Sequence, residues 1–345
     1  MTRFAEFGSN RVRAVALVTD QGPAVGLIVL IAATWTVFGV INGSFVSSFN
    51  LFGIGQLAAR DAVLGMAQAA LVVMGRMNLA VGSVGAICVS LLGYMLVSAN
   101  ISLPLTLLVV AAAGVIASVI MGIVELRSGL SSFIVTLAFT SAYGGGALLF
   151  SRSANFQITN SALNALGSGT FFSEAVCPLV VVALICGGIV WVIYNRTSFG
   201  WKSLAIGANE RAARASGVNA GAVLLGAYAL SGLLAALAAV MESSYELSVN
   251  ANVGSDWLLP SFVAVVLGGV TLTGGDITIA GILLAAVFYD SLQSGLTILN
   301  VSSYWLNLAE GLVLLIAVIA DQARRSRRGR LRRGRAVVAV EVTRV

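Results

Sequence analysis

The sequence contains no histidine, a single lysine and few charged residues, since Asp, Glu, Lys and Arg together make up only 10% of 345 residues. An ordinary soluble domain is about 25% charged. Without histidine the chain lacks the commonest general base and metal ligand, which excludes His-dependent zinc proteases and Ser-His triads. The one lysine, Lys202, follows no Gly-rich loop, so the chain has no P-loop of its own. We therefore expect no catalytic residue, no metal ligand and no cofactor bound by this chain.

Cysteine and proline are also scarce, with three and four residues respectively. Cys88, Cys177 and Cys186 lie in apolar runs and show no Cys-x-x-Cys spacing, so we expect them to pack among helices. What is abundant is apolar: 58% of the residues are hydrophobic, and the mean hydropathy is +0.97. One water-soluble globule of this size cannot hide so much apolar surface, which indicates that the bilayer is the solvent for most of it.

Apolar stretches of the length needed to cross a bilayer as a helix, about 20 residues, recur along the chain. They predict an all-α integral membrane protein of about ten transmembrane helices. The expected spans are 23–41, 54–74, 79–98, 102–124, 132–150, 176–194, 221–242, 257–272, 277–296 and 303–320. The polar start of the chain and the lack of a small-residue cleavage site make a cleaved signal peptide an unfavoured interpretation.

The arginines predict the orientation. With the N-terminus in the cytoplasm, ten spans place 18 basic residues inside and only Arg152 outside, with Arg60 left within a span. The chain then divides into a cytoplasmic N-terminal segment (1–22), a transmembrane domain (23–320) and an Arg-rich cytoplasmic tail (321–345). The tail is typical of a topology anchor attracted to anionic lipid. Nucleic-acid binding is the weaker interpretation, because no aromatic residue is interleaved with its arginines.

An internal similarity indicates two parallel half-repeats. Residues 72–84 align without gaps to residues 265–277, with five of thirteen positions identical. The offset of 193 residues maps spans two to four onto spans eight to ten. The partners are six spans apart, an even number, so both copies have the same orientation, as in parallel-repeat transporters. Chance matching between Gly-rich apolar segments is the alternative.

The longest cytoplasmic loop between spans, residues 195–220, contains the signals of a short amphipathic helix. Asn209 has the character of an N-cap, and Glu210 suits the first turn through the helix dipole. The following Arg-Ala-Ala-Arg-Ala is good helix material, and Gly217 is a C-terminal stop. We expect Ala212, Ala213 and Val218 to form its apolar edge. Without further information this is an ordinary interfacial helix that joins two spans.

Five separate segments resemble the permease subunits of ribose-type monosaccharide ABC importers, over roughly residues 50 to 321. Gly75–Val84 reads Gly-Arg-Met-Asn-Leu-Ala-Val-Gly-Ser-Val, where the family has a Gly-Gly-Ile-Asp-Leu-Ser-Val-Gly-Ser-Val-like motif. The other four are Ser131–Leu137, Ala205–Asn219, Val266–Gly275 and Val301–Trp305. The departures are Arg76 for a usual Gly, Asn78 for a usual Asp, Ser131-Ser132 for prolines, and Glu310 for a commonly basic residue.

This resemblance implies that the short helix is the element through which a separate ABC ATPase subunit, which binds ATP and Mg, moves the permease. Gly207 then permits a tight turn into the helix. Ala213 and its small neighbours fit a groove of the partner, and Arg211 and Arg214 pair with acidic residues there. The expected coupling residues are Gly207, Asn209, Glu210, Arg211, Ala213, Arg214 and Gly217. An extracytoplasmic sugar-binding protein and a permease homodimer or heterodimer are the other implied partners.

Ionisable residues within the spans are candidates for the translocation path, because an unpaired charge in lipid costs several kcal/mol. Four ionisable residues, Arg60, Asp61, Asp290 and Glu310, lie within the expected spans. Counted by depth, all four fall in the outer half of the membrane. Arg60 and Asp61 point about 100° apart on a helix, so we expect them not to face each other. Arg60 either pairs with Glu310 or Asp290, or each charge snorkels to the outer interface. The candidates, with the neutral polar residues added, are Arg60, Asp61, Gln68, Asn78, Asp290, Gln293 and Glu310. For the neutral residues, hydrogen bonding between helices is the competing interpretation.

Together these observations predict a non-enzymatic permease subunit in a bacterial plasma membrane, driven by ATP and carrying a pentose-like monosaccharide. Nucleosides and branched-chain amino acids remain open as substrates. A stand-alone ion-coupled carrier also remains open, but it needs a titratable group near the midplane. A purely structural membrane anchor is the third alternative, and it leaves the coupling segment unexplained.

Overall fold

A computed structural model describes residues 22–169, 177–246, 248–302, 304–306, 308–316, 318–319 and 322. The expected terminal segments 1–22 and 321–345 lie outside the described residues except for Gly22 and Gln322, as do parts of the last expected span. Within the continuously described ranges, the helices longer than twelve residues are α2 (Gly22–Ile41), α3 (Ser48–Val72), α4 (Val81–Gly93), α5 (Leu103–Ser128), α6 (Ser132–Ser151), α8 (Pro178–Arg196), α11 (Ala220–Tyr245) and α13 (Ile279–Ile298).

Within the described residues, seven helices are long and apolar enough to cross a membrane by themselves. They are α2, α4 continued through the π-helix η2 (Tyr94–Ser98), α5, α6, α8, α11 and α13. The 25-residue α3 is also long enough to cross but more polar. Two shorter apolar helices, α12 (Leu258–Leu267) and Tyr304–Ile316, lie where the remaining spans are expected. The protein is a mostly helical, multi-pass membrane protein, and the count of ten spans stays a prediction.

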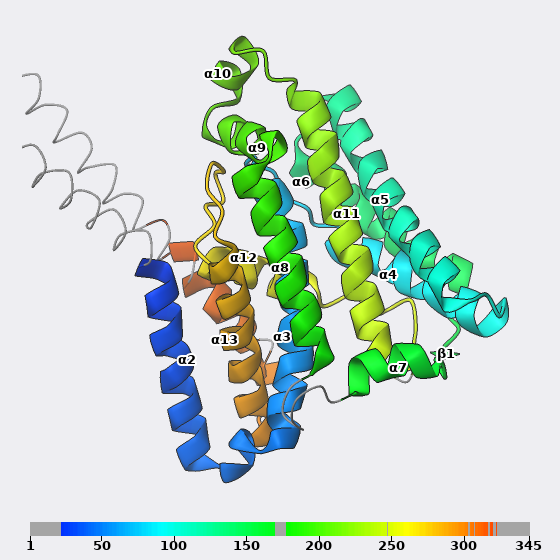
Figure 1. The fold of residues 1–345 in the computed structure, drawn as a ribbon, viewed down its shortest axis with the longest axis vertical. Helices are drawn as coiled ribbons and strands as arrows, with labels where there is room; N and C mark the ends of the chain where they lie inside the picture. Colours follow the sequence, from blue (N-terminus) through cyan, green and yellow to red (C-terminus); the bar gives the residue numbers. More distant parts are fainter. Residues whose placement is uncertain are drawn as a thin grey trace, which may run out of the picture.

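Helix α3 occupies the centre of the fold and packs against α11, α13, α12 and α8 (Figure 1). Its second half, from Asp61 to Val72, is buried throughout. Small residues make this packing close: a Cβ added at Gly65 would lie 2.7 Å from the Cβ of Ala264 on α12 and 2.8 Å from Ile282 on α13. Three other helices, α2, α5 and α8, expose large apolar side chains, as expected of surfaces that face lipid.

Helix α12 is shorter than the predicted span 257–272. Its ten residues rise about 15 Å, half of the hydrocarbon thickness. Gly269, at φ +84°, ends it, and the amide of Val270 donates to the carbonyl of Val265. The chain then runs as an irregular loop to α13. Such backbone is tolerated at membrane depth where protein surrounds it.

The same ending occurs at the C-terminus of α3. Gly75 has φ +71°, and the amide of Arg76 donates to the carbonyl of Leu71. The matching turns pair Gly75 with Gly269, an offset of 194 residues rather than the 193 of the sequence alignment. The two turns are thus alike in hydrogen bonding, and the full extent of the two half-repeats remains a prediction.

The long polar loops contain more structure than their sequences indicated. In residues 151–175 the structure has α7 (Ser161–Ser168) and a strand, β1 (Phe156–Gln157), which pairs antiparallel with β2 (Ser248–Val249). The loop 195–220 holds two helices, α9 (Ser198–Ala208) and the predicted one, α10 (Glu210–Ala215). Both lie at the end of the bundle opposite α7 (Figure 1). All three cysteines are unpaired thiols packed among helices, as predicted.

The close packing around α3 gives a first prediction. We expect Gly65→Ala to lower the free energy of unfolding by about 1–3 kcal/mol, because the new methyl group overlaps α12 and α13. Gly188→Ala on α8 is the matched control, since no atom lies within 4 Å of its added Cβ. Thermal unfolding in detergent measures both, and equal melting temperatures for the two variants would contradict the packing argument.

Candidate functional site

Two parts of the structure hold the residues singled out from the sequence: the α9–α10 end and a cavity at the opposite half of the bundle. The α9–α10 unit is built by its caps. The Thr197 hydroxyl accepts from the Gly200 amide at 3.4 Å and starts α9. The Asn209 side chain accepts from the Ala212 amide at 3.1 Å and starts α10, and Gly217, at φ +85°, follows its end. The predicted cap and stop are therefore confirmed.

Gly207 has a different role from the predicted turn glycine. It lies within the last turn of α9, and its φ is not positive. A Cβ at this position would lie 1.9 Å from the carbonyl oxygen of Val73 and 2.4 Å from the amide of Gly275. Those two groups hydrogen-bond each other at 2.8 Å. Glycine is required here because α9 touches, backbone against backbone, both the end of α3 and the loop after α12.

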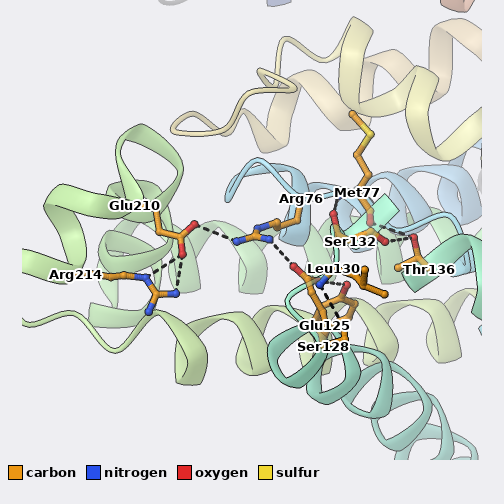
Figure 2. Close-up of polar contacts among 10 residues, drawn as sticks. Arg76, Met77, Glu125, Ser128, Leu130, Ser132, Thr136, Glu210 and Arg214 are labelled. Carbon is orange, nitrogen blue, oxygen red and sulfur yellow. Dashed lines mark hydrogen bonds and ion pairs between the residues drawn. The ribbon is translucent and has the colours of Figure 1, made fainter. Parts of the chain in front are cut away.

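A chain of ion pairs connects α10 to the bundle (Figure 2). Glu210 accepts from Arg214 at 2.7 Å, one turn along α10, and from Arg76 at 3.0 Å. Arg76 also binds Glu125 of α5 at 2.6 Å, and the Tyr228 hydroxyl of α11 donates to the same carboxylate. Arg76 thus links the loop after α3 both to α5 and to α10.

The remaining expected coupling residues divide between buried and exposed positions. Ala213 is buried against the bundle, whereas Ala212 and Arg211 are exposed. Pairing of Arg214 with a partner protein, as predicted, would compete with Glu210, which already binds Arg214 within the chain. The hydrogen bond from Arg214 lowers the pKa of Glu210, helped by the charges of Arg76 and Arg214 and opposed by partial burial.

Two side chains of α6 hold the loop that contains Arg76. The Met77 amide donates to the Ser132 hydroxyl at 3.1 Å (Figure 2). The Leu79 amide donates to Thr136 at the same distance. Serine at position 132 therefore satisfies a backbone donor that a proline ring could not. The sequence departure at this position has a structural reason.

The second part of the site is a cavity of about 520 Å³. This volume lies within the range of small-molecule sites. It is lined by residues of α3, α11, α13, the 252–257 loop and the helix 304–316. Its polar side chains are mainly amides, hydroxyls and carboxylates: Asn50, Asn252, Gln293, Ser255, Ser294, Thr297, Tyr289, Glu242, Asp256 and Glu310. Arg60 is the one cation among the described residues that line it.

Arg60 corrects two expectations. Its Nε lies 2.7 Å from Asp61 and its Nη1 lies 2.8 Å from Glu242 of α11, so it faces its sequence neighbour and pairs with neither Glu310 nor Asp290. A long guanidinium reaches back to the adjacent carboxylate despite the 100° offset between the two Cβ atoms. Glu242 is the last residue of the expected span 221–242, and only the packing of α11 on α3 brings it to Arg60.

The bounds of α3 also change the position of two of these charges along their helix, whereas their depth in the bilayer stays a prediction. Helix α3 begins at Ser48, six residues before the predicted span, so Arg60 and Asp61 lie midway along it. Both Asp61 and Asp290 are fully buried behind the cavity wall. Gln293 and Glu310 line the cavity and hydrogen-bond each other at 3.1 Å.

Gln68 and Asn78 lie outside this cavity and make structural contacts. The Asn78 oxygen accepts from the Ala80 amide at 3.0 Å in a turn that starts α4, and its amide donates to Ser231 at 3.2 Å. With its amide turned to suit its neighbours, Gln68 donates to the Asn78 carbonyl at 2.9 Å and accepts from the Asn78 amide at 3.3 Å. The geometry favours the alternative of helix-to-helix hydrogen bonding for both.

A comparison with known protein families identifies one family that matches most of the chain. Residues 51–318 match the model of the family described as "Branched-chain amino acid transport system / permease component". The chain belongs to this family. Both the α9–α10 unit and the cavity lie within the matched residues, whereas α2 precedes them.

Three relatives illustrate the family. The ribose import permease protein of Bacillus subtilis is 29% identical over 315 residues, 91% of this chain and 96% of the relative. The fructose import permease protein of Rhizobium meliloti is 31% identical over 308 residues, 87% and 85% of the two chains. The galactose/methyl galactoside import permease protein of Escherichia coli K12 is 28% identical over 319 residues, 88% and 95%. No solved structure matches the chain.

Sequence reasoning missed several residues of this permease that the structure brings to the site. Thr197 is an N-cap residue before a helical stretch, so a capping signal for α9 was present. Glu125 and Glu242 lie at the expected ends of spans, and their type alone did not reveal a partner. Gly275 and Val73 act through backbone atoms, which leave no mark on side-chain type.

The contact at Gly207 gives the second prediction. We expect Gly207→Ala to increase amide hydrogen exchange in α9 while the exchange of α3 and α11 stays low, because the methyl group must displace α9 from the Val73 carbonyl. Gly146→Ala on α6, where the added Cβ meets nothing within 4 Å, is the matched control. Unchanged exchange in α9 of the Gly207 variant would show that the contact is loose.

The lowered pKa of Glu210 gives the third prediction. The folded state stabilises the carboxylate, so its ion pairs are present above the usual glutamate pKa of about 4.3 and are lost as pH falls through the lower folded value. We expect a spin label at the exposed position 216 to become more mobile over that acid range. In Glu210→Gln the label should be mobile at every pH, and an unchanged acid transition in this variant would assign it to another group.

Proposed function

We propose that this chain is the membrane-spanning permease subunit of an ATP-driven importer that translocates a monosaccharide, pentose-like in size. A separate ABC ATPase subunit hydrolyses ATP with Mg, and a separate extracytoplasmic binding protein delivers the sugar. Two permease chains, identical or related, form the pathway, with both termini in the cytoplasm of a bacterium. The names of the ribose, fructose and galactose relatives support a sugar as substrate.

The observation that carries the proposal is how α9 and α10 are seated. A force on this unit passes directly into the backbone of Val73 at the end of α3 and of Gly275 before α13. Helices α3 and α13 supply two walls of the cavity, including Arg60, Gln293 and Thr297. An ATPase that moves α9–α10 thereby moves both walls. The exposed Arg211 and the charged Glu210–Arg214 pair present the surface that it contacts.

The lining of the cavity supports a neutral, hydroxyl-rich substrate. Amides and hydroxyls both donate to and accept from sugar hydroxyl groups. The carboxylate of an amino acid needs a cation, and Arg60, the one cation among the described lining residues, is already bound by Asp61 and Glu242. We therefore favour sugars over branched-chain amino acids. Nucleosides also carry hydroxyl groups, and a competition assay distinguishes them from sugars.

A second cavity of about 310 Å³ extends the path toward α4 and α6. It shares Asn252, Gly254 and Ser255 with the first, and its other walls carry Ser83 and Thr140. Its lining is small and neutral. We assign this cavity to the route that the substrate follows between the two copies of the permease.

The fourth prediction tests ATP coupling. In cells that express the permease with its ATPase and binding protein, Glu210→Arg should reduce sugar uptake to the level seen without the ATPase, because it places three cations together at positions 76, 210 and 214. The amount of folded protein in the membrane should stay unchanged. Arg127→Ala is the control, since it removes an exposed cation of α5 outside the α9–α10 unit and should leave uptake unchanged.

Competition identifies the substrate in the same assay. Excess ribose, galactose or fructose should reduce uptake of a labelled sugar, whereas leucine should not and uridine should compete weakly. Full uptake by Glu210→Arg, or uptake that persists without any ATPase, contradicts the coupling role. Strong competition by leucine contradicts the sugar assignment and leaves the coupling role intact.

A further inference from the structure

The loop between β2 and α12, residues 250–257, forms a wall of both cavities described above. Asn252, Gly254 and Ser255 line the cavity of about 520 Å³ and also the one of about 310 Å³. Among the described residues, these three alone line both. Helices α3, α11 and α13 supply the far wall of the larger cavity, and α4 and α6 supply that of the smaller one. A solute that moves from one cavity to the other therefore passes this loop.

Hydrogen bonds within the 250–257 loop give it a compact shape. Three successive turns close it, with backbone amides that donate to carbonyls three residues earlier at 3.1 to 3.3 Å. The side-chain oxygen of Asn250 accepts from the Asn252 amide at 2.8 Å and fixes the first turn. Gly254 has φ +97°, a conformation that suits glycine because it has no Cβ. The loop therefore holds its own conformation without a helix or a strand.

The buried side of this loop is seated on the first two turns of α4. Every third residue, at positions 251, 254 and 257, is buried. A Cβ added at Gly254 would lie 2.3 Å from the carbonyl oxygen of Gly82, and one added at Gly82 would lie 2.0 Å from that of Gly254. The Trp257 ring fills the space beside Gly85, where an added Cβ would lie 2.1 Å from a ring carbon. Close packing of this kind leaves little freedom, so the loop moves with α4.

The other side of the loop carries polar side chains into the cavities. Asn252 and Ser255 are exposed there, and both are neutral. Asp256, whose carboxylate accepts from the Ser255 hydroxyl at 3.2 Å, lines the larger cavity. An amide and a hydroxyl group both donate and accept hydrogen bonds, as the hydroxyl groups of a sugar do. The wall that the two cavities share is thus suited to a neutral polyol.

We propose that Asn252 and Ser255 form the constriction of the translocation path, where a sugar passes between the larger and the smaller cavity. This inference rests on the proposed function, and it names two residues that select for size and for neutral hydrogen-bonding groups. The loop is seated on α4, whereas Gln293 in the opposite wall belongs to α13, which begins at Ile279, close to the Gly275 contact. Movement of the α9–α10 unit therefore shifts Gln293 relative to the loop and changes the width of the path at this point.

Reversible blocking of the constriction tests the proposal. Asn252→Cys and Ser255→Cys are placed separately in the full importer, with its ATPase and binding protein, and ATP-dependent sugar uptake is measured in proteoliposomes. A methanethiosulfonate reagent then adds a sulfonatoethyl group to the thiol. Uptake should fall to the level seen without ATP, because the added group fills the path, and dithiothreitol should restore it by releasing the group. The amount of folded protein should stay unchanged throughout.

Thr159→Cys is the matched control, since Thr159 is exposed but lines neither cavity. Its modified form, and the wild type treated with the same reagent, should keep full uptake, because the native thiols are packed among helices. A smaller methyl adduct at position 252 should reduce uptake less than the sulfonatoethyl adduct does. This dependence on size distinguishes a constriction from a loop whose only role is packing.

Three results would overturn the proposal: full uptake after complete modification, a loss that dithiothreitol does not reverse, or thiols that the reagent does not reach. Mass spectrometry measures the extent of modification, and the second position keeps the test decisive if one variant does not fold. Wild-type uptake that does not depend on ATP would contradict the proposed function. ATP-dependent uptake that modification leaves unchanged would contradict the constriction alone.

Discussion

The contact of α9 with the ends of two other elements, made through backbone atoms alone, is the constraint on which the rest of this structure depends. Gly207, Val73 and Gly275 meet without an intervening side chain. Side chains can rotate and absorb a displacement, whereas abutting peptide groups pass it on. The turn at Gly75 ends α3 beside this unit, and the loop that follows the similar turn at Gly269 brings Gly275 to it. One surface element thereby holds both halves of the bundle.

Ion pairs support the Gly207 contact at one end of the bundle and the cavity in its opposite half. At the α9–α10 end, Arg76 draws Glu125 and Glu210 together from separate elements. In the bundle interior, Arg60 does the same for Asp61 and Glu242. Each arginine belongs to the segment 48–80 around α3, and each binds one acid from a helix far along the chain. The central helix is thus fixed by apolar packing along its length and by one cation near its middle and another beyond its end.

The cavity and the α9–α10 unit are joined by α3 and by α13. An α-helix is stiff along its axis, so displacement of the Val73 end of α3 moves Arg60 at the cavity floor. Both helices also carry a fully buried acid, Asp61 on α3 and Asp290 on α13.

Local signals in the sequence were sufficient for some parts of the site. Asn209 and Gly217 bound a six-residue helix because an Asn cap and a left-handed glycine act within a few residues of the backbone they satisfy. The apolar stretches likewise predicted the long helices. Helix α12 was predicted too long, because its apolar run continues past Gly269, and an apolar side chain does not report a turn in the backbone.

The sequence by itself determined that this chain is a membrane protein, which apolar segments form its long helices, and that residues 209–217 form a short capped helix. These properties depend on composition and on neighbours in sequence. Only the tertiary structure decided that Arg60 binds Glu242, that Gly207 is a contact glycine, and that Arg76 binds both Glu125 and Glu210. Each of these pairs residues of different helices, and their meeting depends on the rotation and close approach of packed helices, which no single segment encodes.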